Sequence, residues 1–500
     1  MGPQSGGIVA SSKVSIAPMN VKRVFAGLAS DSREVRAGYL FAALPGSRED
    51  GARFIADAVK RGASAILGVP AARASTEALG VSFIADENPR LRLAQIAAAY
   101  FGAQPDVVAA VTGTNGKTSV AVFLRQIWEL QGIPAASMGT IGVVAPSGVL
   151  RLEHTTPDPI ETHRLLAQLK HDGVEHLALE ASSHGLDQYR LDGVAIEAVG
   201  FTNLTRDHLD YHSDLAHYLG AKLRLFTELV RAGGVAVVNA DAGHADQFIR
   251  AARIRGLKLV TVGERGETLR LLAHEAHGDG QSLTIAYDGQ EFGVELPLVG
   301  DFQASNALVA AGLAIGLGNG PPDVFAALAC LAGAPGRLEK VAYAASGAPV
   351  YTDYAHTPDA LETVLTAIRP HVRDRLHLVF GCGGDRDRGK RLLMGAAAAR
   401  LADAVIVTDD NPRSEEPGAI RREILAGCPQ AEEIGDRAQA IRMAIARLDT
   451  GDVLVIAGKG HETGQIIGDE THPFHDAQAA IDAALTSGGK AGRAQPRALA

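Results

Sequence analysis

The most constraining stretch of this sequence is VVAAVTGTNGKTSVAVFLRQIWEL, residues 107–130. Its first part is a short apolar run, typical of a strand that is buried on both faces. Its last part is typical of a long helix, and glycines at Gly113 and Gly116 separate the two. A buried strand that passes through a glycine loop into a helix predicts an α/β fold with a parallel sheet.

The glycine loop has the composition of a phosphate-binding loop. Its backbone N–H groups and the helix N-terminus would face phosphate, with Lys117 near the outer phosphates and Thr118 reaching a magnesium ion. The usual pattern, G-x-x-x-x-G-K-[ST], has a glycine five residues before Gly116, where this chain has Val111. The loop is therefore predicted to bind ATP in a subclass different from that of GTPases and kinases. An ordinary strand-to-helix turn is the alternative.

Strand-like and helix-like segments alternate after this loop. Strands are predicted within 176–182, 198–204 and 234–241, with helical segments between them, so the sheet is predicted to be mostly parallel. Between about 256 and 300, four segments are typical of antiparallel strands appended to that sheet. The turn GAPGRLE then marks a domain boundary near residue 336.

Shorter patterns lie on both sides of this central region. A small α/β pattern precedes it and ends at a linker, Gln104–Pro105. After the boundary, a Rossmann-like alternation places four buried-type strands before polar loops, within 350–355, 375–384, 402–410 and 452–460. Ligands gather at the carboxyl ends of such strands. Residues 488–500 are predicted to form a disordered tail.

Composition excludes several classes of function. The formal net charge is −9, which disfavours a nucleic-acid binder held by bulk electrostatics. The three cysteines are far apart, which argues against disulfides or a zinc site and suits a reducing cytoplasm. No apolar signal region and no run of about 18 apolar residues is present, so we expect neither export nor membrane insertion.

Polar residues follow two of the central strands. Glu180 ends one strand, where a second magnesium ligand is wanted, although a helix cap is an equal alternative. His208 lies between Asp207 and Asp210 after the next strand, a pattern that favours metal or substrate contact. Lys222 lies on a helix, and by itself it would be interpreted as a solvated lysine.

Five charged motifs fill the last third of the chain, and each combines glycine or a turn with charged groups. They are GRLE (336–339), DYAHTPDAL (353–361), GCGGDRDRGKR (381–391), DDNPR (409–413) and GKGHETGQ (458–465). Any one of them could be a solvated turn. Four follow strand-like runs, so together they predict a binding site.

These motifs together resemble those of the Mur ligase family of ATP-dependent amide-forming enzymes. The resemblance runs from SDSREVRAGYLFAALPG (30–46) to GKGHETGQ (458–465), nearly the whole chain. The family's loop is G-T-N-G-K-T-S, as it stands at 113–119, so Val111 agrees with the family's own form. The resemblance implies a UDP-binding domain (1–104), a central ATPase domain (105–336) and a C-terminal domain that brings the amino acid (337–487).

The resemblance also implies the reaction. ATP would phosphorylate the D-glutamyl γ-carboxylate of UDP-N-acetylmuramoyl-L-alanyl-D-glutamate, and meso-2,6-diaminopimelate would attack the acyl phosphate. In this family DNPR, here 410–413, accompanies diaminopimelate, and Arg413 can grip the distal carboxylate that lysine lacks. The enzyme would work in peptidoglycan precursor synthesis in the cytoplasm, as a monomer.

Motif matches assign the site residues as follows. Catalytic roles would fall to Lys117, His208 and Lys222, and two Mg²⁺ ions to Thr118, Glu180, His208 and Lys222, the last as a carbamate. ATP would contact Gly113, Thr114, Asn115, Gly116, Lys117, Thr118, Ser119, Asn306, Arg337 and Asp353. The UDP-sugar dipeptide would contact Ser30, Thr155, Thr156, Ser182 and Arg190. Diaminopimelate would contact Arg386, Asp410, Asn411, Pro412, Arg413, Gly458 and Glu462.

Alternatives remain at this level. A lysine-adding ligase is the nearest, and a folylpolyglutamate synthase would share the loop but should lack DNPR. A phosphate-loop switch or small-molecule kinase would need the glycine that Val111 replaces, and a non-catalytic binding module would leave the charged loops without a purpose. One departure from the family pattern is Gln303, where asparagine is usual, and it concerns only a nucleotide contact.

Overall fold

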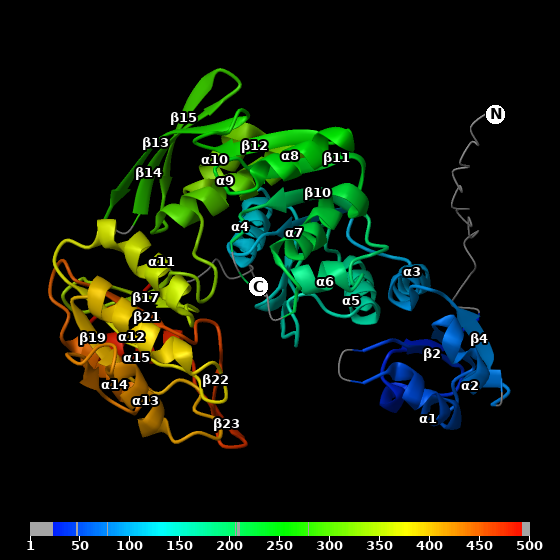
Figure 1. Ribbon diagram of the computed structural model, residues 1–500. Coiled ribbons are helices and arrows are strands. Elements are labelled where there is room, and N and C mark those ends of the chain that lie inside the picture. The colour runs from blue at the N-terminus through cyan, green and yellow to red at the C-terminus, as the bar shows by residue number, and fades with distance from the viewer. Residues whose placement is uncertain are drawn as a thin grey trace, which may run out of the picture. The chain divides into compact units, whose positions relative to one another are not determined.

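The structure is a computed structural model that describes residues 24–46, 49–77, 79–205, 207, 211–278 and 280–492 (Figure 1). These residues group into two compact units. The first comprises the described residues up to Gln104 together with Asp158–Gln168 and Gln188–Val194, and the second comprises the rest. Within the described part of the chain, no helix has the length and apolar character needed to cross a membrane.

The first unit is built on a four-stranded parallel sheet in the order β1-β2-β3-β4. Its strands are β1 (Gly27–Ala29), β2 (Tyr39–Ala43), β3 (Ala65–Gly68) and β4 (Ser82–Ala85), and its helices are α1 (Ile55–Lys60), α2 (Arg73–Glu77) and α3 (Pro89–Phe101). Alternate residues of β2 face opposite sides. Leu40 packs in a cluster with Leu93 of α3, whereas Phe41 packs in a cluster with Ile55 of α1.

The second unit contains an eleven-stranded sheet in the order β15-β14-β13-β12-β11-β10-β5-β9-β6-β7-β8. Its strands are β5 (Val107–Thr112), β6 (Ala135–Gly139), β7 (Gly142–Ala145), β8 (Gly148–Leu150), β9 (His176–Glu180), β10 (Ile196–Phe201), β11 (Val230–Asn239), β12 (Lys258–Gly263), β13 (Leu269–His277), β14 (Gly280–Tyr287) and β15 (Gln290–Leu296). The helices of this region are α4 (Lys117–Leu130), α5 (Pro159–His171), α6 (Ser183–Asp187), α7 (Leu215–Arg224), α8 (Ala245–Ile254), α9 (Asp301–Gly316) and α10 (Pro321–Leu328). The first residues of α5 belong to the first unit.

The predicted antiparallel addition is smaller than expected. The segment LKLVTVG forms β12, which pairs in parallel with β11, and β13 also joins β12 in parallel. Of the four strands predicted in this region, β13, β14 and β15 pair as antiparallel neighbours. At the other edge of the sheet, β6, β7 and β8 also pair antiparallel. The short apolar segment of β12 is buried against α9, as a crossover strand requires, and periodicity does not report the direction of a strand.

Helices α4 and α9 bury their apolar side chains on one face of this sheet. Val120 and Leu124 of α4 join Leu308 of α9 in the main core cluster, together with the strand residues Ala109 and Val237. On the other face, Phe248 of α8 stacks on Phe201 of β10, with ring centroids 3.7 Å apart. The packing holds the carboxyl end of β5, and thus the glycine loop, between two helical layers.

The C-terminal part of the second unit is a seven-stranded sheet in the order β20-β19-β18-β21-β17-β16-β24. Its strands are β16 (Glu339–Tyr343), β17 (Pro349–Asp353), β18 (Leu376–Phe380), β19 (Ala404–Val407), β20 (Glu432–Glu433), β21 (Val453–Ala457) and β24 (Lys490–Ala491), and β22 (Gly464–Ile467) and β23 (Glu470–Pro473) form a separate hairpin. Helices α11 (Pro358–Ile368), α12 (Gly389–Leu401) and α13 (Pro417–Leu425) share one core cluster, and α14 (Arg437–Ala446) and α15 (Asp476–Thr486) share the other. The four predicted strands are confirmed as β17, β18, β19 and β21, all mutually parallel.

The expected disordered tail is wrong for its first residues. Lys490 and Ala491 form β24, which pairs antiparallel with β16 at the sheet edge. The Gly492 N–H then donates to the Val341 carbonyl at 2.7 Å. A two-residue strand between glycines carries no hydrophobic pattern, so only its edge position in the sheet identifies it. Residues 493–500 lie outside the described residues.

Candidate active site

The glycine loop takes a backbone path that only glycine follows easily. Gly113 has φ of +152° and Gly116, the N-cap of α4, has φ of +86°. A Cβ atom at Gly113 would lie 1.9 Å from the Thr202 hydroxyl oxygen, and one at Gly116 would lie 2.3 Å from Asn306 Oδ1. The loop is therefore packed against the residue that follows β10 and against α9. The backbone N–H groups at the N-terminus of α4 point toward the loop, where they can face a phosphate.

Neighbouring residues hold the loop from the β10 side. The Thr114 N–H donates to the Asn203 carbonyl, and the Asn115 N–H donates to Asn203 Oδ1 at 3.0 Å. The Thr202 hydroxyl donates to the Asn115 carbonyl at 2.5 Å. These bonds argue against an ordinary solvated turn, because the backbone at Thr114 and Asn115 is held by the two residues that follow β10.

Two lysines meet at one carbonyl of the loop. Lys117 Nζ donates to the carbonyls of Gly113 and Thr114 at 2.9 and 2.8 Å. Lys222 Nζ donates to the same Gly113 carbonyl at 2.7 Å, and only 1% of Lys222 is exposed. Lys222 is thus not the solvated helical lysine that its position in α7 suggested. Burial and the neighbouring Lys117 hold the pKa of Lys222 well below its ordinary value.

Glu180 lies at the end of β9 beside the loop. Its Oε2 accepts from the Thr118 hydroxyl at 3.0 Å, and its Oε1 accepts from the Thr140 N–H at 2.7 Å. The carboxylate is only 2% exposed, and both of these partners lie outside α6, so it is not a cap of that helix. A hydroxyl and a carboxylate side by side at a phosphate loop are oxygen donors of the kind that Mg²⁺ prefers, so these residues fit the ion.

The other expected metal residues are less complete. His208 and Asp210 lie outside the described residues. Among the residues that the structure does describe, no group of three or more His, Cys, Asp or Glu side chains gathers as a metal site.

The residues expected to contact the UDP-sugar dipeptide divide between the two units. Thr155, Thr156 and Ser182 surround Glu180: Thr155 bonds to Thr140, and the Thr156 hydroxyl donates to the Glu180 carbonyl at 2.9 Å. The Ser182 hydroxyl donates to the Thr156 hydroxyl oxygen and accepts from the Gly185 N–H. Ser182 thereby caps the N-terminus of α6. Ser30 and Arg190 belong to the first unit, where Ser30 directly follows β1 and Arg190 bonds to Gln188.

The residues expected at the adenine nucleotide form a chain of contacts. Asn306 approaches the loop at Gly116 and donates to Gln303 Oε1 at 3.3 Å. Gln303 in turn donates to the Arg337 carbonyl at 2.8 Å, so this departure from the family pattern has a defined structural partner. The Arg337 guanidinium lies over the Tyr354 ring, 4.8 Å from its centroid.

Asp353 ends β17 beside these groups. Its two oxygens accept from the N–H groups of Leu338 and Ala355 at 2.8 and 2.7 Å. Burial raises the pKa of this carboxyl above its ordinary value, although Arg337 opposes the change. Through these two hydrogen bonds, Asp353 holds the turn that contains Arg337.

The DNPR segment and the GKGHETGQ segment meet around a buried lysine. Lys459 Nζ donates to Asn411 Oδ1 at 2.9 Å and to Glu462 Oε2 at 3.0 Å, and it lies 3.7 Å from Asp410. Asn411 Nδ2 donates to the same Glu462 oxygen at 2.9 Å. Gly458, with φ of +113°, would bring a Cβ to 2.7 Å from Asp410 Oδ2. Three residues expected to bind the amino acid are therefore held by a lysine that sequence reasoning did not assign.

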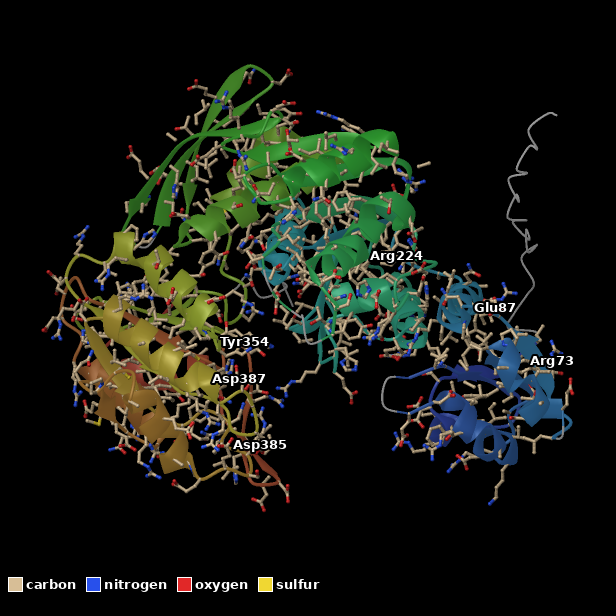
Figure 2. All side chains as sticks on the ribbon, viewed as in Figure 1. Arg73, Glu87, Arg224, Tyr354, Asp385 and Asp387 are labelled. Atoms are coloured by element: carbon tan, nitrogen blue, oxygen red, sulfur yellow. The ribbon has the colours of Figure 1, made fainter. Side chains whose placement is uncertain are left out.

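The two arginines expected to grip the amino acid lie on adjacent loops. Arg413 has φ of +51°, and its Nη1 donates to the Gly384 carbonyl at 2.7 Å. Its neighbour Pro412 approaches the other loop, because a Cβ at Gly384 would lie 1.9 Å from the Pro412 carbonyl oxygen. Arg386 is exposed and donates only weakly, to the Asp385 carbonyl at 3.4 Å. Figure 2 shows Tyr354, Asp385 and Asp387 on loops along one edge of the C-terminal part.

A cavity of about 320 Å³ in the second unit joins the two groups of loops. Thr140 and Arg151 line it from the central part, and Asn411, Arg413 and Glu462 line it from the C-terminal part. The Thr140 N–H also donates to Glu180, which lies beside the phosphate loop. The cavity therefore extends from the surroundings of Glu180 toward the DNPR segment. A carboxyl group activated near Glu180 and an amine held near Glu462 could meet here.

Sequence reasoning missed several residues of this site. Lys459 lies in the motif GKGHETGQ and Arg391 in GCGGDRDRGKR, but nothing in either pattern distinguishes these residues from solvated cations. Thr140 and Asn203 lie at strand ends without a charge or a glycine pattern. Only the packing of neighbouring strands brings these groups to the loop.

Three family models match successive segments of the chain. They are described as "Mur ligase family, catalytic domain" at residues 24–101, "Mur ligase middle domain" at 111–314 and "Mur ligase, glutamate ligase domain" at 336–460. The UDP-N-acetylmuramoyl-L-alanyl-D-glutamate–2,6-diaminopimelate ligase of Bradyrhizobium diazoefficiens is 57% identical over 465 residues, covering 92% of this chain and 95% of the relative. The chain belongs to the Mur ligase family.

Solved structures agree with the placement among Mur ligases. A structure of a UDP-N-acetylmuramoyl-L-alanyl-D-glutamate–2,6-diaminopimelate ligase superposes with a TM-score of 0.69 at 36% identity, covering 92% of this chain and 95% of that one. The MurF ligase of Thermotoga maritima in complex with ADP has a TM-score of 0.56 at 18% identity, covering 92% and 96%, and shows likeness of fold alone. The predicted Mur ligase fold, with mostly parallel α/β sheets, is thus confirmed.

Proposed function

We propose that this Mur ligase is an ATP-dependent amino-acid ligase of peptidoglycan precursor synthesis. It joins meso-2,6-diaminopimelate to the D-glutamyl γ-carboxylate of UDP-N-acetylmuramoyl-L-alanyl-D-glutamate. The observation that carries the proposal is the cavity that connects Glu180's surroundings with the intact DNPR segment, 410–413. The relatives named for this reaction support it at 57% and 36% identity.

The phosphate loop activates the carboxylate substrate. ATP binds at residues 113–119, with Asn306, Arg337 and Asp353 at the nucleotide. Its γ-phosphoryl group passes to the γ-carboxylate, which gives an acyl phosphate and leaves ADP. When ATP binds, the Lys117 side chain rotates away from the Gly113 and Thr114 carbonyls and donates to the phosphate instead. Magnesium, when bound, neutralises charge between the two anions that must meet. Thr118, Glu180, His208 and Lys222 as a carbamate would hold the two ions.

The UDP-sugar dipeptide is bound by residues of the N-terminal and central parts of the chain. The N-terminal domain, 1–104, binds the uridine nucleotide through Ser30, and Thr155, Thr156, Ser182 and Arg190 hold the muramoyl-dipeptide. The central domain spans 105–336 and the C-terminal domain 337–487. Exclusion of water from the cavity then favours attack by the amine over hydrolysis of the acyl phosphate.

The C-terminal loops select the amine substrate. Arg386 and Arg413 bind the carboxylate at the distal end of diaminopimelate, and Asp410, Asn411, Gly458 and Glu462 complete the pocket. Lysine lacks this carboxylate and would leave a guanidinium unpaired, and sites of this kind reject such analogues by roughly 10⁴-fold. Pro412 limits the conformations of the loop, so Arg413 is held in place before the substrate arrives.

The test is release of inorganic phosphate from ATP by the purified protein with the UDP-dipeptide present. Meso-diaminopimelate, L-lysine and no amino acid are offered in turn. We expect release only with diaminopimelate, and mass spectrometry should show a UDP-tripeptide. Equal rates with lysine would refute the choice of amino acid, and no release with any of the three would refute the proposed reaction.

A further inference from the structure

Two non-glycine residues with left-handed backbones lie on the two loops that bond to each other here, and one of them, Arg413, ends the DNPR segment. Asp385 has φ of +52° and Arg413 has φ of +51°, and they lie on the loops that follow β18 and β19. A left-handed conformation costs about 1–2 kcal/mol in a residue with a Cβ. Such strain persists where the surroundings over-determine it, and it is found often at functional sites.

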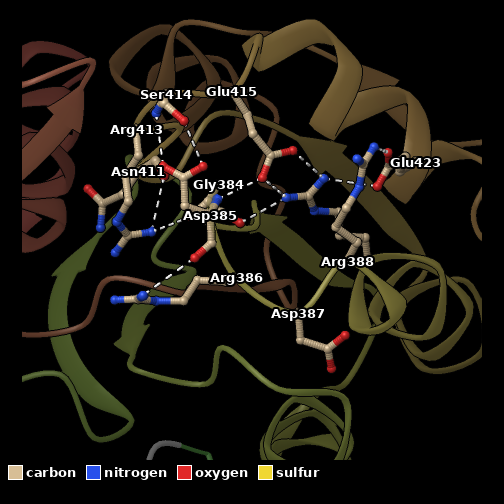
Figure 3. Close-up of polar contacts among 12 residues, drawn as sticks. Gly384, Asp385, Arg386, Asp387, Arg388, Asn411, Arg413, Ser414, Glu415 and Glu423 are labelled. Atoms are coloured by element: carbon tan, nitrogen blue, oxygen red, sulfur yellow. Dashed lines mark hydrogen bonds and ion pairs between the residues drawn. The ribbon is translucent and has the colours of Figure 1, made fainter. Parts of the chain in front are cut away.

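Hydrogen bonds between the two loops hold this strain. Ser414 donates to the Asp385 carboxylate twice, from its N–H at 3.1 Å and from its hydroxyl at 2.7 Å. The Asp385 N–H donates to Glu415 Oε1 at 2.6 Å. Figure 3 shows this set of contacts, together with the bond from Arg413 to the Gly384 carbonyl. Each strained residue is therefore fixed by a partner on the opposite loop.

A buried arginine, Arg391, connects the two loops to helix α13. Arg391 of α12 is fully buried, and its two terminal nitrogens donate to both oxygens of Glu415 at 2.8 and 3.0 Å. The same guanidinium donates to Glu423 of α13 at 2.9 Å and to the Gly383 carbonyl at 3.3 Å. The bidentate pairing with Arg391 fixes the orientation of the Glu415 carboxylate as well as its distance from the guanidinium. The hydrogen bonds from Arg391 lower the pKa of Glu415 to about 2, so this carboxylate is an anion at neutral pH.

We propose that Arg391, Glu415 and Asp385 form a clamp that presets Arg386 and Arg413 for the distal carboxylate of the amino-acid substrate. These three are positioning residues, which act through the two loops rather than by touching the substrate. The proposal rests on the proposed function, because it assigns the arginines to that carboxylate. Preorganisation of this kind lowers the free-energy cost of ordering the loops on binding.

The clamp predicts a selective loss of affinity for the amino acid. Glu415→Gln removes one acceptor of Arg391, and Ser414→Ala removes the hydroxyl bond to Asp385. Each should raise KM for diaminopimelate roughly tenfold, because small misplacements of binding groups have large effects. The KM values for ATP and the UDP-dipeptide, and kcat at saturation, should stay within about twofold, because both loops follow strands of the C-terminal sheet, whereas the phosphate loop follows β5 of the eleven-stranded sheet.

Asp385→Gly separates positioning from folding. Glycine adopts the left-handed backbone without strain, so this variant keeps the turn and loses only the two bonds from Ser414. Asp385 is exposed, so the change leaves no buried group unpaired. We expect the same rise in KM for diaminopimelate with an unchanged melting temperature. A merely structural role would move neither KM nor the ratio of diaminopimelate to lysine turnover.

The matched control is Arg400→Gln on α12, the helix that also carries Arg391. Arg400 is exposed and pairs with Glu362 of α11, outside the Arg391–Glu415–Asp385 network, so KM for diaminopimelate should stay unchanged. If unmodified protein releases phosphate with diaminopimelate but Asp385→Gly and Ser414→Ala keep its KM, the clamp is refuted. If the unmodified protein releases none, the proposed function fails instead. Should Glu415→Gln not fold, the two exposed-loop variants still decide.

Discussion

At the scale of single residues, charge in this site is set by burial as much as by sequence. Lys459 is fully buried and touches Asn411 and Glu462. Its contact also fixes the Asn411 amide, since Oδ1 accepts from both Lys459 and the Ile466 N–H. The Asn411 nitrogen must then face Glu462. A motif shows that these residue types are present, but it does not show which one is the buried cation.

Lys459→Met should change the pH dependence of the reaction. Burial raises the pKa of Glu462, but Lys459 and the hydrogen bond from Asn411 outweigh this, so its pKa lies below its ordinary value. Without Lys459 the anion loses its cation, its pKa rises, and the carboxylate is lost at a higher pH as acid is added. We expect the acid limb of kcat/KM for diaminopimelate to move to higher pH, with KM up by roughly tenfold or more.

Glu462 also interacts electrostatically with Tyr354, Asp410, His461 and Arg437, and these groups remain in the variant. Lys258→Met is a suitable control, because Lys258 donates to the Gly316 carbonyl in the central part. Its acid limb should match that of the unmodified protein. An unmoved acid limb in Lys459→Met would contradict the electrostatic role of Lys459.

At the scale of elements, the strand–loop–helix unit of β5 and α4 was predictable because its pattern is local. Apolar residues, two glycines and a helix follow one another within 24 residues of sequence (107–130). The pairing of β12 and β13 was not predictable, because parallel and antiparallel strands present similar apolar patterns. Strand direction depends on the helices that pack on either side.

Gly113→Ala tests the loop's need for glycine. The new Cβ would lie 1.9 Å from the Thr202 hydroxyl oxygen and 3.1 Å from backbone atoms of Asn203, so the loop must move. We expect ADP affinity, measured by calorimetry, to fall roughly a hundredfold, because displaced amides no longer converge on phosphate.

Gly132→Ala at the other end of α4 is the matched control. Gly132 also has a left-handed φ, of +76°, but a Cβ there meets nothing within 4 Å. It should lower stability by about 1 kcal/mol while leaving ADP affinity unchanged. Equal ADP affinities for the two alanine variants would contradict the packing argument.

At the scale of the whole molecule, the end of the chain contributes to the C-terminal sheet. Lys490 and Ala491 pair with β16, and the Lys490 ammonium lies 4.8 Å from the Tyr343 ring centroid. β24 is therefore the edge strand of this sheet, and it covers the edge of β16. Sequence reasoning placed these residues in a disordered tail because they lack an apolar run.

Truncation before Lys490 should lower the apparent melting temperature by about 2 °C relative to truncation after Gly492, because it removes net hydrogen bonds worth about 1 kcal/mol each. Differential scanning fluorimetry measures this difference. The two truncated proteins should bind ADP equally, because β24 pairs with β16 at the edge of the C-terminal sheet, whereas the phosphate loop follows β5 of the eleven-stranded sheet. Identical melting temperatures would show that β24 adds no stability.

The sequence by itself determined the Mur ligase family, the α/β class and the positions of the charged loops. These properties are carried by short local patterns, such as glycine spacing at 113–116 and the intact DNPR at 410–413. Tertiary structure alone decided that Lys222 is buried, that Lys459 and Arg391 hold the amino-acid loops, and that β24 completes a sheet. The reason is physical: burial, pKa and hydrogen-bond partners depend on residues that meet only when distant strands pack together.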